Sequence, residues 1–376
     1  MHYFTFAEKD TTIYQASASL NAGMDEILEV RKEVSDSGDS VNVSRILMRF
    51  DISYISSSIV SGTITNPKFY LNLFDAKSSN LNTSQSLYAY PISQSWDMGQ
   101  GRSYDNPITT EGASWNYRDG LTNGTIWTSE ISGSGGTWYT GSGYVASHSI
   151  SHKTIDIRMD VTDIVNRWLD GDVPNDGFMV KRSGSVGNLD SSADEGSVTS
   201  FGQLAFFSSD THTKYPPTLE TVWDDSKWSE GSLSPLTQTN IEDMVVYMKG
   251  LRPEYKEKSK VKFRLVGRAK YPTKSYSNTA SEYLTAKYLP SGSKENIGGD
   301  GAYYSVRDAQ TEDVIIPFGS GSLISCDSTG NYFNLWMNGF QSERYYKFEF
   351  KVVSGSNTVD ETIQYFDDDF TFKVVR

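Results

Sequence analysis

Acidic side chains are the most abundant groups in this sequence that could do chemistry, and a pair of carboxyls is what a glycoside hydrolase uses. Such an enzyme holds its two acids roughly 5–10 Å apart around the sugar. The adjacent Asp224 and Asp225 and the run Asp367–Asp369 have the required side chains. With 47 Asp and Glu in the chain, neighbouring acids are expected by chance. Nothing around them predicts a cleft, so we expect no catalytic pair and a protein that is not an enzyme.

Histidines and one acidic turn are the candidate metal ligands. His148 and His152 would lie about 13 Å apart on a strand, too far for shared zinc coordination, and "ASHSISHKT" has no apolar helical stripe. The segment Asp170–Gly177, "DGDVPNDG", resembles a calcium loop, but Pro174 and Lys181 stand where an EF-hand needs ligands. The sequence therefore predicts a helix end and a turn there, with no metal ligands and no cofactor.

Patterns for covalent and phosphate chemistry are also missing. The sequence contains neither a G-x-S-x-G nucleophile turn nor a GxxxxGK[ST] phosphate loop. Gly133, Gly135 and Gly136 are not followed by a helical pattern and indicate a flexible turn. The single cysteine, Cys326, excludes an intrachain disulfide and a cysteine-based zinc site.

Aromatic residues in glycine-rich segments are the remaining candidates for a binding site. Trp138, Tyr139 and Tyr144 lie in "GGTWYTGSGY", and Trp115 and Tyr117 lie in "SWNYRDG". Exposed rings can stack on the apolar faces of sugars, and aromatic rings also concentrate contact energy in protein interfaces. Three roles stay open: a glycan-binding platform, a contact between subunits and, for Trp115, a place in the core.

Composition limits the class of protein. A net charge of −13 argues against a nucleic-acid partner, because binding to phosphates needs a concentrated basic surface. No apolar run approaches the roughly 18–20 residues that cross a bilayer. The N-terminal stretch "MHYFTFAEKDTTIYQ" lacks the basic start and apolar run of a secretory signal. A virus-particle protein that folds in the cytoplasm would explain the absence of a secretory signal, and so would a fragment trimmed of its signal.

The elements that must position these side chains are predicted to be strands. Residues 45–53, "RILMRFDIS", place apolar Ile46, Met48 and Phe50 opposite Arg45, Leu47, Arg49 and Asp51, and residues 68–74, "KFYLNLF", alternate in the same way. This spacing predicts strands buried on one face. "SLYAYPIS" predicts a further strand that Pro91 ends or places at an edge. Long connections such as "DMGQGRSYDNP" are expected to be functional or poorly ordered.

One helix interrupts this pattern in the segment 154–182, between strands at 155–159 and 177–182. Its apolar stripe consists of Val161, Ile164, Val165, Trp168 and Leu169, which recur at helical spacing. Asp160 or Thr162 is the expected N-cap, and Gly171 can adopt the left-handed conformation after the last turn. The helix is predicted to close one end of a sandwich and to bring an indole to the core.

A composition shift divides the chain into a unit at 1–226, a linker at 227–239 and a second unit at 240–376. Seven of the eight tryptophans precede Pro235, and the stretch after Trp223 is polar and rich in turn residues. The second unit holds at least five strand candidates, among them "KVKFRLVGRAKY", "YFNLWMNGF" and "RYYKFEFKVV". It is therefore predicted to be a smaller β-sandwich, immunoglobulin-like in its strand number.

The order of motifs over residues 8–225 resembles the DNRLRE domain family, a jelly-roll fold like that of carbohydrate-binding modules. The matching segments are "DTTIYQ", "SRILMRFDIS", "SQSWDMGQ", "GASWNYRDG", "IDIRMDVTDIVNRWLDGDVPNDGFMVKRS" and "YPPTLETVW". The sequence departs from the family in long Gly/Ser insertions between Asp97 and Gly143. The resemblance implies a jelly-roll β-sandwich with one short helix, and it leaves open a structural Ca²⁺ whose ligands it does not name.

The second unit resembles segments of structural proteins from tailed bacteriophages, notably in "YYSVRDAQTEDVIIPF" and "CDSTGNYFNLWMNGFQSERYYKFEFKV". Together the two resemblances imply an all-β structural component of a virion, present in many copies and bound to other virion proteins. It would assemble in the host cytoplasm and be released by lysis, without membrane insertion. Two alternatives stay open: an adhesin for a host surface glycan, which would act extracellularly, and a polysaccharide-degrading enzyme.

Overall fold

The computed structural model describes residues 1–34, 41–82, 84–122, 124–128, 135–151, 155–184, 194–197, 199–236, 244–271, 286–290, 301–354 and 362–376. Strands dominate these residues, and their α-helices are α1 (Ser53–Val60) and α2 (Thr162–Leu169). The predicted all-β class is confirmed. Neither of these helices has the length and apolar character needed to cross a membrane.

The chain forms two compact units whose boundaries differ from those that composition suggests. The N-terminal unit contains Phe4–Thr63 and Lys68–Thr221, and the C-terminal unit contains Met1–Tyr3, Ile64–Pro67 and Val222–Arg376. The division after Thr221 falls five residues before the predicted end of the first unit at 226.

The stretch predicted as a linker, 227–239, is in its described part built into the C-terminal unit. Trp228 forms a parallel β-bridge with Cys326. Strand β11 (Ser234–Pro235) pairs with β15 (Lys287–Tyr288). Each of these pairings involves only one or two residues, too few to leave an alternating pattern in the sequence. The polar, turn-rich composition of the stretch therefore indicated a linker. Residues 237–239 lie outside the described residues.

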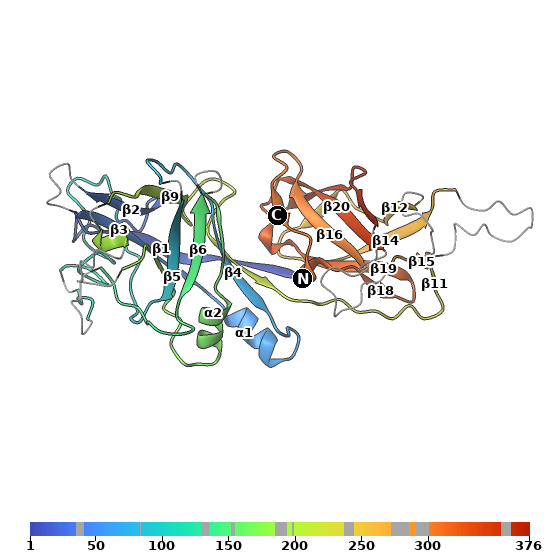
Figure 1. The fold of residues 1–376 in the computed structure, drawn as a ribbon, viewed down its shortest axis with the longest axis horizontal. Helices are drawn as coiled ribbons and strands as arrows, with labels where there is room; N and C mark the ends of the chain where they lie inside the picture. Colours follow the sequence, from blue (N-terminus) through green and yellow to red (C-terminus); the bar gives the residue numbers. More distant parts are fainter. Residues whose placement is uncertain are drawn as a thin grey trace, which may run out of the picture. The chain divides into compact units, whose positions relative to one another are not determined.

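The N-terminal unit is a jelly-roll-like β-sandwich (Figure 1). Its strands are β1 (His2–Tyr14), β2 (Ile27–Val34), β3 (Val41–Phe50), β4 (Lys68–Leu73), β5 (Ser84–Pro91), β6 (Ala146–Ser151), β7 (Ile157–Asp160), β8 (Phe178–Lys181), β9 (Gly202–Phe207) and β10 (Thr218–Val222). They are hydrogen-bonded in the order β6-β5-β8-β3-β1-β10-β4-β7, and β2 joins β3 to β9. A 3-10 turn, η1 (Asp194–Gly196), precedes β9.

Strand β3 is buried on both faces, whereas its alternation predicts burial on one. Ile46, Met48 and Phe50 face the sandwich core as expected, but Leu47 and Arg45 on the opposite face are buried as well. The long loop between β5 and β6 covers that second face and adds a further apolar cluster around Leu47. Alternation within one strand cannot reveal such a cover, because the covering residues are distant in the sequence.

The predicted helix is confirmed as α2, but its N-cap residue is Val161, without a side-chain capping hydrogen bond, and not Asp160 or Thr162. The Asp160 carboxylate accepts a hydrogen bond from the Thr162 backbone N–H at 3.0 Å, and Gly171 adopts a positive φ of 76° just after the last turn. The Trp168 ring is buried 4.6 Å from the ring of Phe178. Helix α1 was not predicted, since its sequence "SYISSSIV" buries little more than Ile55 and leaves no clear apolar stripe.

The C-terminal unit packs two sheets around a core of phenylalanines. One sheet has the order β12-β14-β19-β18, and the other has the order β13-β22-β20-β16-β17 with β21 beside β20 (Figure 1). Phe263 and Phe333 from the first sheet lie 4.9 and 5.3 Å from Phe348 of the second, measured between ring centroids. This unit is therefore a β-sandwich, with a parallel pair, β13 and β22, at one edge.

The bounds of these elements are β12 (Met244–Lys249), β13 (Glu254–Lys256), β14 (Lys260–Ala269), β16 (Gly301–Asp308), β17 (Val314–Ile316), β18 (Ser325–Asp327), β19 (Gly330–Trp336), β20 (Tyr345–Ser354), β21 (Thr362–Phe366) and β22 (Thr371–Val375). Two 3-10 turns, η4 (Ser320–Ser322) and η5 (Met337–Gly339), connect them. The strands predicted from the sequence of this unit correspond to β14, β17, β19, β20 and β22.

Candidate binding surface on the loop between β5 and β6

The long loop at 92–145 is organised by one buried asparagine from the β1–β2 connection. Asn21 has no exposed surface. Its Nδ2 donates hydrogen bonds to the carbonyl oxygens of Met98 and Ala113 at 2.8 and 2.9 Å. Its Oδ1 accepts one from the backbone N–H of Gly101 at 2.8 Å. This side chain adds to the backbone hydrogen bonds of the same segment, such as the one from the Ala113 N–H to the Asp97 carbonyl oxygen at 2.7 Å.

Glycines allow the loop to approach that asparagine. Gly99 and Gly112 have positive φ values of 75° and 111°. A Cβ on Gly99 would lie 2.4 Å from the Oδ1 of Asn21, and a Cβ on Gly112 would lie 2.5 Å from its Nδ2. The segment "DMGQGRSYDNP" is therefore ordered around Asn21. Asn21 lies 77 residues from Met98 in the sequence, so residue spacing alone could not identify Asn21 as the partner of this segment.

A layer of tryptophans lies beneath the loop. Trp96, Trp115 and Trp127 are buried, and Trp138 packs against them, in a cluster that includes Leu47 of β3. The indole N–H groups of Trp96 and Trp127 each donate to a backbone carbonyl at 2.9 Å. Large rings whose polar atoms are satisfied make a stiff support, so the loop rests on a second core.

An ion pair fastens this layer to the sheet. Arg45 of β3 is 3% exposed, and its guanidinium donates to both carboxylate oxygens of Glu195 at 3.1 and 2.6 Å. The same guanidinium lies 4.7 Å from the ring of Trp115 and 5.1 Å from that of Trp138. It also donates to the carbonyl oxygen of Gly135. Gly135, predicted as part of a flexible turn, is packed against this pair.

Further cations are buried close to the same carboxylate. The ammonium of Lys181 lies 3.2 Å from Glu195 and 5.0 Å from the Trp138 ring. Burial lowers the pKa of Lys181 to about 8 and that of Arg182 to about 10. Arg182 donates to Gln85 at 2.6 Å, and Lys32 donates to the Ser197 carbonyl oxygen at 2.7 Å. The group holds the interior together and offers a ligand little access.

The outer side of the loop exposes apolar side chains that sequence analysis did not select. Tyr104 is 72%, Ile108 53%, Leu121 42% and Ile126 55% exposed. The two loop segments that carry them are hydrogen-bonded to each other, with the Leu121 N–H donating to the Thr110 carbonyl oxygen at 3.2 Å. We call these four residues the loop surface. Their only sequence signal is that apolar residues occur in an otherwise polar insertion.

The aromatic residues selected from the sequence occupy three different environments. Trp115 is 8% exposed and lies in the core, which is one of the three roles left open for it. Trp138 is half-buried on the buried cations, and Tyr117 is half-buried in a β-bridge with Ile126.

Tyr139 and Tyr144 are half-buried as well and form a pair. Their ring centroids are 5.8 Å apart with planes inclined by 31°. The Arg167 guanidinium from α2 lies 5.2 Å from the Tyr144 ring. The structure therefore brings Tyr139 and Tyr144 together.

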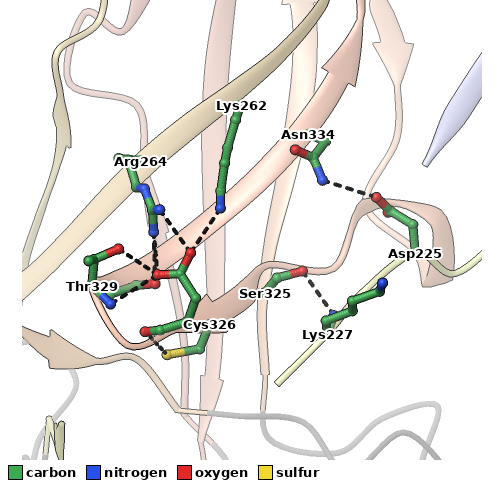
Figure 2. A network of polar contacts seen from close by, with 10 residues as sticks. Asp225, Lys227, Lys262, Arg264, Ser325, Cys326, Thr329 and Asn334 are labelled. Carbon is green, nitrogen blue, oxygen red and sulfur yellow. Dashed lines mark hydrogen bonds and ion pairs between the residues drawn. The ribbon is translucent and has the colours of Figure 1, made fainter. Parts of the chain in front are cut away.

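The groups considered for catalysis and metal binding are scattered. His148 is half-buried, and desolvation lowers its pKa; His152 lies outside the described residues. Asp225 contacts the amide of Asn334 at 3.5 Å within the C-terminal unit (Figure 2). In the part of the chain that the structure covers, no three His, Cys, Asp or Glu side chains gather as metal ligands.

One carboxyl, Asp10 in β1, is strongly perturbed. Burial raises its pKa to about 7. Its two oxygens accept hydrogen bonds from the backbone N–H and the hydroxyl of Ser209 at 2.8 and 3.1 Å. These contacts tie β1 to the turn after β9, which is a structural role.

Comparisons with known proteins do not assign a family. No family model matches the chain, and no curated protein matches it. A solved structure to which it is similar is the FMN-binding beta-glucuronidase from Facaelibacterium prausnitzii L2-6, at 9% identity and a TM-score of 0.16. The match covers 95% of this chain, which spans 39% of that one. A TM-score this low supports no argument about fold or activity.

Proposed function

We propose that this protein is a non-catalytic structural component of a tailed-bacteriophage virion and that it binds neighbouring virion proteins through the loop surface. The observation that carries the proposal is the loop itself, which exposes Tyr104, Ile108, Leu121 and Ile126 on a support fixed by Asn21. The motif resemblances in both units suggest the virion as the setting.

Preorganisation makes such a surface effective. Fully burying one large apolar side chain contributes about 1.5–3 kcal/mol, and ordering a loop during binding would offset much of that gain. Here Asn21 and the tryptophan layer order the loop beforehand. Weak contacts of this kind become stable when many copies bind together.

The test is retention in purified particles. Mass spectrometry of particles should find the chain at a fixed stoichiometry. The triple variant Tyr104→Ser, Ile108→Ser and Leu121→Ser should fold but be lost from particles. The matched control is Val60→Ser, because Val60 is 86% exposed at the end of α1 and outside the loop. Particles that retain the triple variant at normal copy number would refute a contact through the loop surface.

Glycan binding is kept as a second candidate because of the half-buried pair Tyr139 and Tyr144. Inclined neighbouring rings beside an arginine can stack on a sugar ring and donate to its hydroxyls. A glycan array with the full chain tests this: signal that disappears in Tyr139→Ala and persists in Tyr117→Ala would support an adhesin. An array without signal would remove this candidate.

A further inference from the structure

A basic pocket opens in the C-terminal unit, between the start of β14 and the edge pair β13 and β22. Its volume is about 610 Å³. Five cationic residues line it, all of them exposed, together with one acidic residue, Glu254: Lys249, Arg252, Lys256, Lys260 and Lys262. We infer that this pocket binds a small ligand that carries two or more phosphate or sulfate groups.

A tight turn in the backbone separates two of the cationic residues that line the pocket. Lys256 and Lys260 flank a tight turn in which the Ser259 hydroxyl donates to the Lys256 carbonyl oxygen at 2.6 Å. Lys258, inside the turn, takes a positive φ of 59°. The turn brings lysines from two strands to one opening, where their like charges repel each other.

The floor of the pocket is anchored in the aromatic core. Tyr255 is 9% exposed, and its ring lies 5.0 Å from Phe263 and 5.8 Å from Phe372. The Tyr255 hydroxyl accepts a hydrogen bond from the Arg252 backbone N–H at 2.8 Å. The segment that carries Arg252 is thereby fixed, so the pocket exists before a ligand arrives.

Among the residues that the structure describes, three of the five cations of the pocket have no ion-pair partner. Lys262 pairs with Asp327 at 2.8 Å (Figure 2), and Lys260 lies 5.6 Å from the ring of Trp336. Lys249, Arg252 and Lys256 form no ion pair with any residue that the structure describes. In a chain with net charge −13, a hollow in which five cationic residues face one carboxylate attracts anions to it.

The volume and the charged groups of the pocket limit the class of ligand that it can bind. A volume of about 610 Å³ falls within the usual range of small-molecule sites. Tetrahedral oxyanions accept several charge-assisted hydrogen bonds, and an arginine can bind two of their oxygens at once. The ligand could be a free polyphosphate or the end of a phosphorylated or sulfated glycan, since both present the same groups.

Isothermal titration calorimetry of the full chain tests the site with three probes: tripolyphosphate, a heparin-derived tetrasaccharide and a short DNA duplex. We expect saturable binding of one or both small anions at a single site, weakened as salt rises because charge drives it. Preference for tripolyphosphate would indicate a free polyphosphate, and preference for the tetrasaccharide would indicate a glycan end.

Two variants locate the binding. Lys256→Gln combined with Lys260→Gln should weaken it about tenfold or more, since it removes two charged donors. Lys270→Gln is the matched control, because Lys270 is exposed just beyond the other end of β14. The double variant should unfold at an unchanged or higher temperature, so its loss of binding would not reflect misfolding.

Three outcomes would overturn the inference. The first is no saturable binding of either small anion at low salt. The second is equal weakening by Lys270→Gln and by the double variant. The third is binding of the DNA duplex in preference to both small anions, which would make the cations part of a nucleic-acid surface.

Discussion

Both units gather lysine and arginine side chains, but they place them in opposite surroundings. In the N-terminal unit Lys32, Arg45, Lys181 and Arg182 are at most 3% exposed. In the C-terminal unit the cations of the basic pocket are exposed. The sequence shows two sets of basic residues, and only burial distinguishes a set that holds the interior together from one that can meet a ligand.

The surroundings also change what each charge contributes to stability. A buried cation loses its hydration and needs a fixed acceptor for its hydrogen bonds. Glu195 supplies acceptors to Arg45 and Lys181. An exposed cation keeps its water, so a nearby carboxylate adds at most about 1 kcal/mol. Substitutions should therefore have large effects on folding in the first region and small ones in the second.

The largest effect is expected from Glu195→Gln. It removes the charge that compensates Arg45 and Lys181 inside the protein, which should lower the free energy of unfolding by about 3–5 kcal/mol. Urea denaturation measures the change. Glu343→Gln is the control, because Glu343 is 61% exposed in its pair with Lys373. A loss below about 1 kcal/mol for Glu195→Gln would show that the buried cluster behaves like a surface pair.

A smaller effect should appear in the pH dependence of stability through Lys181. Its pKa is about 8 in the folded protein and 10.5 without burial. Between those values the unfolded chain binds the extra proton, so raising the pH from 8 to 10 should stabilise the folded state by about 2 kcal/mol. Lys181→Met should lack this component. Equal pH slopes in the wild type and the variant, from urea denaturation, would contradict burial of the charge.

Asp327→Asn should have a modest effect. Asp327 accepts hydrogen bonds from Arg264 at 2.6 and 2.8 Å and from Lys262 at 2.8 Å (Figure 2). These contacts hold its pKa well below the usual range. The folded state thus gains stability above pH 4, and this gain is lost as the pH falls. With 29% of the side chain exposed, we expect a loss of about 1 kcal/mol at pH 7, which salt should reduce. A loss unaffected by salt would place this network with the buried charges.

The smallest effect on stability is expected from Lys256→Gln with Lys260→Gln. Both side chains are exposed and surrounded by like charges, so the free energy of unfolding should change by less than about 0.5 kcal/mol. Thermal denaturation at low salt is the measurement. A clear destabilisation would show that these lysines support the fold and would remove the contrast between the two regions.

Local pattern predicted the elements well where each residue's surroundings come from its own strand or helix. The alternation in β4 and the stripe of α2 are examples, since Phe69, Leu71 and Trp168 are buried as expected. Prediction failed where a distant segment supplies the surroundings. Leu47 is buried by the loop at 92–145, and that loop is ordered by Asn21.

The candidate sites show the same limit. An aromatic residue in a glycine-rich segment can face solvent or the interior, and spacing does not decide which. Trp115 is buried because Arg45 and Gly135 pack against it. The lysines of the basic pocket are visible in "YKEKSKVKFR", but a run of charges usually indicates a solvated face. Only the folded structure shows that Lys256, Lys260 and Lys262 line one pocket.

The division of the chain between its units limits how this protein can be dissected. The polypeptide passes from one unit to the other after Tyr3, Thr63, Pro67 and Thr221. A gene fragment beginning at Val222 would lack Met1 and His2, whose side chains are buried in the C-terminal unit. A fragment ending at Thr221 would carry those residues without their surroundings. Cutting the chain after Thr221 therefore leaves the N-terminal unit whole but the C-terminal unit without Met1–Tyr3 and Ile64–Pro67, and a permuted or tethered design would have to supply those two segments.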